Sequence, residues 1–186
     1  MKKLTLMRHG DNATDPDYAK HGIWQPQSRL TDVGVKQLEV LRDNYFVGRN
    51  YKISIHSPFD RTKQTGTIVL PNNQWVEADK LVAENLGELN TIYKTKNPAT
   101  IKDIEALLPR FCEDTQTRIM SVVNKTLNAL NDGEEAIMVG HEPSLTLALS
   151  TFDKSYNAYG QLLPKAGICV LSFSDDNMFL SCEEVT

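Results

Sequence analysis

Three short apolar segments of this chain each stop abruptly at charged, imidazole or small polar residues. They are segments 3–8, 51–56 and 135–140, and they lead into the sequences RHG, SPFDR and GHEP. Helix-like sequence separates them, and this alternation is typical of an α/β protein with a largely parallel sheet. Because the carboxyl ends of parallel strands meet at one edge of a sheet, we expect the three polar clusters to meet there too.

Three further strands are expected, at 74–77, 167–173 and 178–182. The last two are separated by the sequence SDDN, residues 174–177, which is rich in turn-forming residues. This link predicts a hairpin that adds an antiparallel edge to the sheet.

Helices and loops are expected between these strands. Thr31 or Asp32 can cap a helix that starts there, and the apolar residues of 115–130 follow the spacing of one helical face. Two long irregular stretches, about 11–29 and 78–98, each follow an expected strand. Loops of this length in a compact domain are usually functional, so we expect them to border an active site.

The 186 residues predict a single domain over 1–186. A formal net charge of −4 argues against nonspecific nucleic-acid binding, and no segment is long enough to cross a bilayer. The three cysteines are far apart and form no CxxC pair, which indicates neither a disulfide framework nor a zinc site. We therefore expect a cytoplasmic protein with no nucleic-acid or membrane partner.

Two arginines and two histidines lie in the three polar clusters: Arg8, Arg61, His9 and His141. A guanidinium presents a planar fork of donors that matches phosphate oxygens, and an imidazole can act as a nucleophile near neutral pH. Two arginines in one pocket would repel a cation, so we expect an anionic substrate, no metal and no cofactor. Together the four residues predict a phosphate pocket with an attacking histidine.

Each residue also has an ordinary structural interpretation when it is taken alone. Arg8 and Arg61 are compatible with solvated surface charges, and His9 with a cap or an edge of the core. His141 precedes a Glu-Pro pair and is compatible with a helix start. His21 and His56 lack a supporting motif and are expected to be loop and strand-end histidines. The functional interpretation rests on the shared position of the four residues after strands.

Four ordered motifs, LMRHGDN, RLTDVGVKQ, SPFDRTKQT and MVGHEPSL, resemble the signatures of the histidine phosphatase (phosphoglycerate mutase-like) superfamily. The compact chain looks most like the small bacterial phosphohistidine phosphatases. The resemblance implies a three-layer α/β/α sandwich and a covalent phosphohistidine intermediate. It places the nucleophile at His9, phosphate ligands at Arg8 and Arg61, and a second pocket histidine at His141.

The resemblance also implies a proton donor, which many members carry in a segment like LxExxxG. Here the stretch reads LVAENLGELN, and we expect Glu84 to be the acid, with Glu88 and Asp11 as alternatives. The expected activity is metal-independent hydrolysis of a small phosphomonoester or of a phosphohistidine protein. A phosphoglycerate mutase-type phosphotransferase and a noncatalytic phospho-ligand-binding module are the alternative functions.

Overall fold

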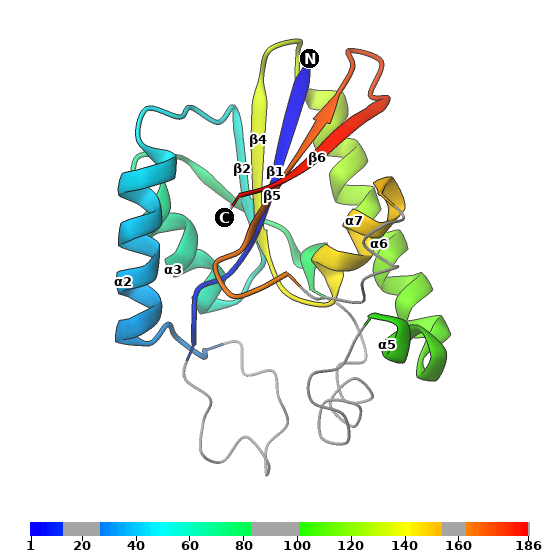
Figure 1. Cartoon of the computed structure of the whole chain (residues 1–186), viewed down its shortest axis with the longest axis horizontal. Helices are drawn as coiled ribbons and strands as arrows, with labels where there is room; N and C mark the ends of the chain where they lie inside the picture. The colour runs from blue at the N-terminus through cyan, green and yellow to red at the C-terminus, as the bar shows by residue number, and fades with distance from the viewer. Residues whose placement is uncertain (13–26, 83–100, 154–162, 186) are drawn as a thin grey trace.

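A six-stranded sheet forms the centre of the computed structural model, which describes residues 1–12, 27–82, 101–153 and 163–185 (Figure 1). The strands follow the order β3-β2-β4-β1-β5-β6 across the sheet. Their bounds are β1 (Lys2–Arg8), β2 (Ile53–His56), β3 (Trp75–Glu77), β4 (Glu135–Gly140), β5 (Ile168–Phe173) and β6 (Phe179–Val185). The first four strands are parallel, whereas β5 runs antiparallel to β1 and β6 antiparallel to β5. The predicted mostly parallel sheet and its C-terminal hairpin are confirmed.

Helices cover both faces of this sheet. Their bounds are α2 (Asp32–Leu41), a π-helical turn η1 (Arg42–Phe46), α3 (Asp60–Val69), a 3₁₀ turn η2 (Asp79–Leu81), α5 (Ile101–Leu107), α6 (Pro109–Ala129) and α7 (Ser144–Phe152). Figure 1 shows α2 and α3 on one side of the sheet and α6 and α7 on the other. The expected three-layer α/β/α sandwich is therefore confirmed. No helix within the described ranges is long and apolar enough to cross a membrane.

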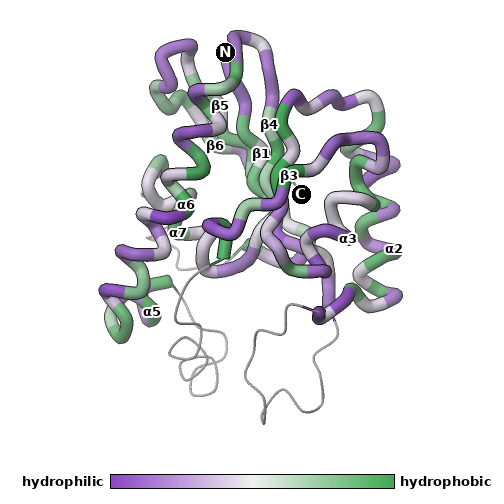
Figure 2. The backbone as a smooth tube through the Cα atoms, turned by 180° about the vertical axis from the view of Figure 1, so that it is seen from behind, coloured by the Kyte–Doolittle hydropathy of each residue, from purple (hydrophilic) through white to green (hydrophobic). Residues whose placement is uncertain are grey.

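The inner strands β1 and β4 are buried on both faces because each face packs against a helical layer. In β1, Leu4 and Leu6 join the apolar cluster on the α6 and α7 side, whereas Met7 joins the cluster that includes Leu38 of α2. All four side chains are fully buried. Figure 2 accordingly shows hydrophobic residues concentrated in the central strands of the sheet.

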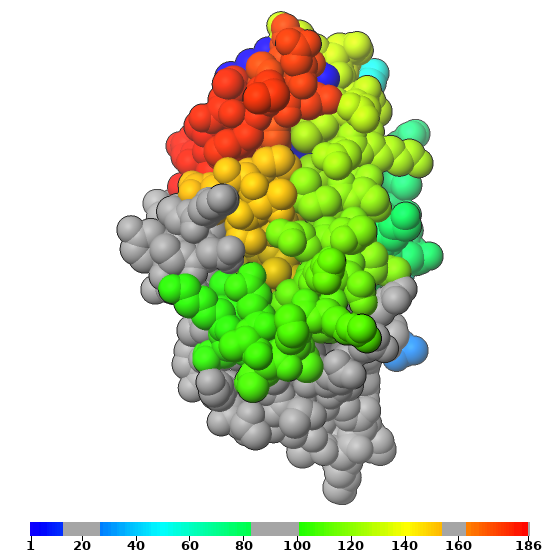
Figure 3. Space-filling view, turned by 90° about the vertical axis from the view of Figure 1, so that its right-hand side faces the viewer, coloured from blue at the N-terminus to red at the C-terminus, as the bar shows by residue number. Residues whose placement is uncertain are grey.

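Helix α6 is longer than the sequence pattern indicated. The predicted range was 115–130, whereas the helix begins at Pro109, which occupies its first turn. Phe111 and Cys112 in the added segment are buried and extend the apolar stripe toward the N-terminus. Proline suits this position because its fixed φ is helical and it lacks only an N–H that would have no helical partner. Figure 3 shows α6 lying along this face beside α7.

The start of α2 holds the chain that follows β1. Thr31 caps the helix by accepting a hydrogen bond from the backbone N–H of Gly34 at 3.0 Å, as predicted. Gly34 packs so closely that a Cβ there would lie 2.2 Å from the carbonyl oxygen of Asp11. Only glycine allows this contact, because the opposing atom belongs to backbone and cannot rotate away. Helix α2 therefore positions the segment just after His9.

Candidate active site

The carboxyl ends of β1, β2 and β4 meet at one edge of the sheet. Arg8 at the end of β1 is in register with Gly140 at the end of β4. His9 and His141 follow these two positions, and their ring centroids lie 5.1 Å apart. Arg61, in the first turn of α3, places its Nε 3.3 Å from Nε2 of His9. The structure thus brings together residues that are separated by more than one hundred positions in the sequence.

His9 has a defined tautomer. Its Nδ1 lies 2.7 Å from the carbonyl oxygen of Gly10, which can only accept a hydrogen bond, so Nδ1 carries the ring proton. Nε2 therefore presents a lone pair, and the N–H of Arg61 donates to it. The backbone N–H of Gly10 donates to Oγ1 of Thr65 at 3.1 Å, which ties the loop that carries His9 to α3. The unprotonated nitrogen of His9, Nε2, is therefore the one that faces the guanidinium of Arg61.

Burial is the main cause that lowers the pKa of His9 well below 6.5, and the positive charge of Arg61 lowers it further. The pKa of His141 is lowered in the same direction, again by burial first and by Arg61 second. Both side chains are almost completely buried. The two imidazoles are therefore neutral at physiological pH, and an attacking imidazole must be neutral.

Phe59 packs between two of the polar side chains. Its ring centroid lies 4.8 Å from that of His141, and the guanidinium carbon of Arg61 lies 4.6 Å from the centre of its ring. Such contacts fix a planar guanidinium while adding a favourable cation–π interaction. Phe59 belongs to the SPFDR motif, but the motif alone predicts no role for it.

Arg8 is held by a bridge that sequence reasoning missed. Its Nη1 donates to the carbonyl oxygen of Leu163 at 2.7 Å, and the N–H of Leu163 donates to the buried carboxylate of Glu142 at 3.1 Å. Burial raises the pKa of Glu142, while the charge of Arg8 opposes this shift. Nε of Arg8 is buried and has no hydrogen-bond partner among the described residues. A substrate oxygen would supply the acceptor that this N–H lacks.

Ser57 and Thr62 orient the ring of His141. Oγ of Ser57 lies 2.6 Å from Nε2 of His141 and 2.8 Å from Oγ1 of Thr62. Thr62 Oγ1 is also within 2.8 Å of two backbone carbonyl oxygens, so its single proton is donated to them. The Ser57 hydroxyl thus links Thr62 to His141 and fixes the plane of the imidazole. Ser57 directly follows β2, and that position was the available signal for its role.

Lys165 is a further cation at the site that the motifs did not indicate. Its ammonium forms an ion pair with Oδ1 of Asp11 at 3.4 Å and a hydrogen bond with Oδ1 of Asn12. The other carboxylate oxygen of Asp11 accepts from Oγ1 of Thr31 at 2.9 Å. Both oxygens of Asp11 are thus already engaged by neighbouring side chains.

Some predicted residues fall outside the described part of the chain. Glu84 and Glu88, the two expected proton donors, lie there, as does His21. His56 is described: it is buried at the end of β2, where its Nδ1 lies 2.6 Å from the carbonyl oxygen of Ser57 and its ring packs near Trp75. This is the strand-end position that the sequence predicted.

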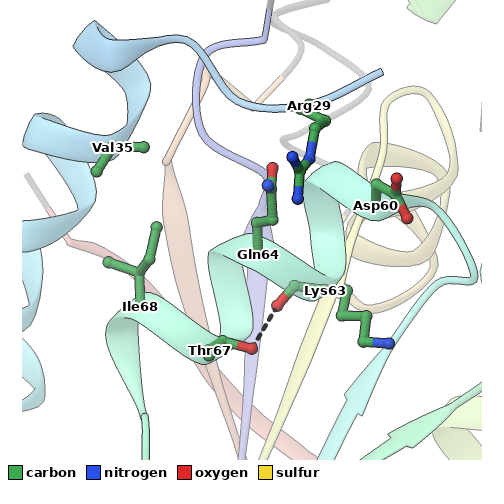
Figure 4. A pocket seen from close by; sticks show the side chains of 7 residues that line it. All are labelled: Arg29, Val35, Asp60, Lys63, Gln64, Thr67 and Ile68. Atoms are coloured by element: carbon green, nitrogen blue, oxygen red, sulfur yellow. Dashed lines mark hydrogen bonds between the residues drawn. The ribbon is translucent and has the colours of Figure 1, made fainter. Parts of the chain in front are cut away.

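A separate hollow of about 420 Å³ lies on the outer face of α3 (Figure 4). Asp60, Lys63 and Thr67 line it from this face, and Arg29 lies above them. Arg61 belongs to the opposite, buried face of the same helix. The hollow is therefore distinct from the site formed by His9, His141 and Arg61. Within the described ranges, no three histidine, cysteine or acidic residues cluster in a way that would hold a metal ion.

Comparisons with known proteins agree with this geometry. The family model of the histidine phosphatase superfamily (branch 1) matches residues 4–184. No curated protein sequence matches the chain.

Solved structures from several species share its fold. A candidate phosphohistidine phosphatase, SixA of Agrobacterium tumefaciens, is 16% identical with a TM-score of 0.62, covering 97% of this chain and 96% of that one. A phosphoserine phosphatase of Entamoeba histolytica is 16% identical with a TM-score of 0.66, covering 100% and 98%. A phosphoglycerate mutase of Bacillus anthracis is 18% identical with a TM-score of 0.71, covering 98% and 92%.

Proposed function

The chain belongs to the histidine phosphatase superfamily (branch 1), and from this membership we propose that it is a phosphatase that works through a phosphohistidine on His9. The proposed substrates are small phosphomonoesters or a phosphohistidine on another protein. The observation that carries the proposal is the 3.3 Å contact between Nε of Arg61 and the lone pair on Nε2 of His9. At this contact the proposed nucleophile, the neutral ring of His9, lies beside the proposed phosphate-binding guanidinium of Arg61.

In the first chemical step, Nε2 of His9 attacks phosphorus and the bond from phosphorus to the leaving oxygen or nitrogen breaks. For this to happen, substrate binding must turn the N–H of Arg61 from His9 onto a phosphoryl oxygen. The ring proton stays on Nδ1, which donates it to the carbonyl oxygen of Gly10, so Nε2 attacks with its lone pair. The product of this step is a phosphohistidine and the departed group. Water then attacks the phosphohistidine, which releases inorganic phosphate and restores the neutral ring.

Arg8, Arg61 and His141 are the proposed ligands of the phosphoryl group. The two guanidiniums neutralise the charge that spreads over the phosphoryl oxygens in the transition state, which is the main demand of phosphoryl transfer. Nε of Arg8 gains its missing acceptor when a phosphoryl oxygen arrives. Because these cations supply the positive field, we propose that the reaction needs neither a metal nor another cofactor.

Glu84 remains the proposed proton donor to the leaving group, and Glu88 its alternative. Asp11 is the weaker third candidate, since both of its carboxylate oxygens already accept hydrogen bonds or an ion pair. A phosphohistidine substrate needs less protonation from an acid than an alkyl ester does, because its leaving nitrogen is already a good leaving group once protonated by solvent.

A rapid-quench experiment with an aryl phosphate tests the proposal. We expect a burst of phenol equal to the enzyme concentration, an acid-labile phosphoenzyme, and unchanged turnover in a chelator. His9→Ala should abolish both the burst and the phosphoenzyme while circular dichroism stays that of the native protein. Turnover by a folded His9→Ala variant would overturn the mechanism. Binding of phosphate esters without any turnover would favour the noncatalytic module instead.

A further inference from the structure

Lys165 is presented by a turn that is bonded directly to the nucleophile. The turn runs from Pro164 to Gly167 and is closed by a hydrogen bond between the carbonyl of Pro164 and the N–H of Gly167 at 2.8 Å. The N–H of Ala166 donates to the carbonyl oxygen of His9 at 3.0 Å. Ala166 has a φ of 59°, in the left-handed region that residues other than glycine seldom adopt. A strained backbone is thus retained next to the site, as is common where a side chain must be held in place.

The ammonium of Lys165 is fixed but not saturated. It has three N–H groups, and two of them are directed at Oδ1 of Asp11 and Oδ1 of Asn12. Its side chain is 32% exposed, whereas His9 is 4% and Arg61 3% exposed. We call the two buried residues the floor of the site and the more exposed Lys165 its rim. A phosphoryl group on the floor would therefore direct its leaving group toward the rim.

We infer that Lys165 is a specificity residue that binds a second negatively charged group on the leaving-group side of the substrate, such as a carboxylate or a second phosphate. The inference rests on the proposed function, because it takes His9 as the point of attack. It assigns the floor to the transferring phosphoryl group and the rim to the rest of the substrate. The preferred substrates are then phosphate esters that carry another anion close to the ester.

The charges around Lys165 support this assignment. Burial lowers its pKa, and the positive charges of Arg8 and Arg61 act in the same direction, while Asp11 opposes them. An ammonium in such a cationic surrounding gains more from an anionic partner than an isolated surface lysine does. Asp11 supplies one anion in the free protein, and the remaining N–H is available for a second one from the substrate.

A pair of matched substrates tests the inference: 3-carboxyphenyl phosphate and its neutral isostere 3-carbamoylphenyl phosphate. We expect the wild type to favour the carboxylate in kcat/KM at low ionic strength. Lys165→Met should lower kcat/KM for the carboxylate ester by about tenfold and for the amide ester by less than about twofold. The loss should lie mainly in KM, and Lys165→Arg should retain most of the preference.

Lys63→Met is the control variant, because Lys63 is an exposed lysine on the outer face of α3. Lys63→Met should leave kcat/KM unchanged for both the carboxylate ester and the amide ester. Equal losses on the two esters in Lys165→Met, or no loss on either, would overturn the inference while the proposed function stands. Failure of the wild type to hydrolyse either ester would overturn the proposed function, and the inference with it.

Discussion

Nε of Arg61 lies 3.3 Å from Nε2 of His9, so one guanidinium both occupies the lone pair on Nε2 and lowers the pKa of the ring. The charge of Arg61 is the second cause of that shift, after burial. In the proposed mechanism the same cation binds the phosphoryl group once the substrate arrives. The mechanism therefore predicts that one side chain links the pH dependence of the reaction to its transition-state stabilisation.

Arg61→Leu tests this link. We expect kcat/KM to fall by a factor that corresponds to roughly 2–4 kcal/mol, the usual loss for a preorganised charged donor. The acid limb of the pH profile should also move to higher pH, because a neighbouring positive charge no longer disfavours protonation of His9. Profiles of kcat/KM between about pH 4 and 8 measure both effects. Arg42→Leu, at an exposed arginine paired with Asp43, is the control and should match the wild type.

A lowered histidine pKa has a consequence for stability as well. As the pH falls below 6.5, the unfolded chain protonates its histidines while His9 in the folded protein stays neutral. The free energy of unfolding should therefore decrease with falling pH, by up to about 1.4 kcal/mol per pH unit for this one group. His9→Gln should reduce that slope in urea unfolding between about pH 5 and 7.5. The opposite contribution of Glu142, whose pKa is raised, is common to both proteins and cancels. An identical slope in the variant would show that His9 is not held neutral.

Ser57→Ala should weaken catalysis without exposing the pocket. The variant removes the hydroxyl that contacts Nε2 of His141, so the ring loses the hydrogen bond that orients it. Loss of one such buried hydrogen bond corresponds to roughly 1–2 kcal/mol, and we expect kcat/KM to fall by about five- to thirtyfold. Ser121→Ala, at an exposed serine of α6, is the matched control. Kinetics of Ser57→Ala equal to those of the control would remove Ser57 from the site.

Much of this architecture could be predicted because it depends on patterns that are local in the sequence. The inner strands of the sheet are short, largely apolar runs, and three of them lead into polar residues at the shared edge of parallel strands. That rule was sufficient to bring His9, His141 and Arg61 together. Helix α6 begins earlier than expected because the apolar spacing of 115–130 does not include the buried Phe111 and Cys112 of its first turns.

Lys165 shows why the remaining part of the site could not be predicted. It precedes β5, and the first residues of a parallel strand would lie at the opposite edge of the sheet from His9. Instead β5 pairs with β1 in the antiparallel direction, with Ile168 opposite Met7. This pairing brings the start of β5 to the edge of the sheet that carries His9. Strand direction depends on contacts between distant segments, so no local sequence pattern predicts it. The bridge from Glu142 through Leu163 to Arg8 depends on the same pairing.

The proton donor is the last point that can be tested by substitution. The alkoxide released from an alkyl phosphate is a poor leaving group and requires a proton at the departing oxygen. Aryl phosphates and phosphohistidine require less assistance. If Glu84 is the donor, Glu84→Gln should slow alkyl phosphate hydrolysis by about 10²-fold or more and aryl phosphate hydrolysis by much less. Single-turnover rates on a matched alkyl and aryl pair give the measurement. Glu88→Gln is the control, and a selective loss on alkyl phosphates there would move the acid to Glu88. Equal small losses in both variants would exclude both carboxylates, and a substrate that departs without a protein acid, such as phosphohistidine, would then be favoured.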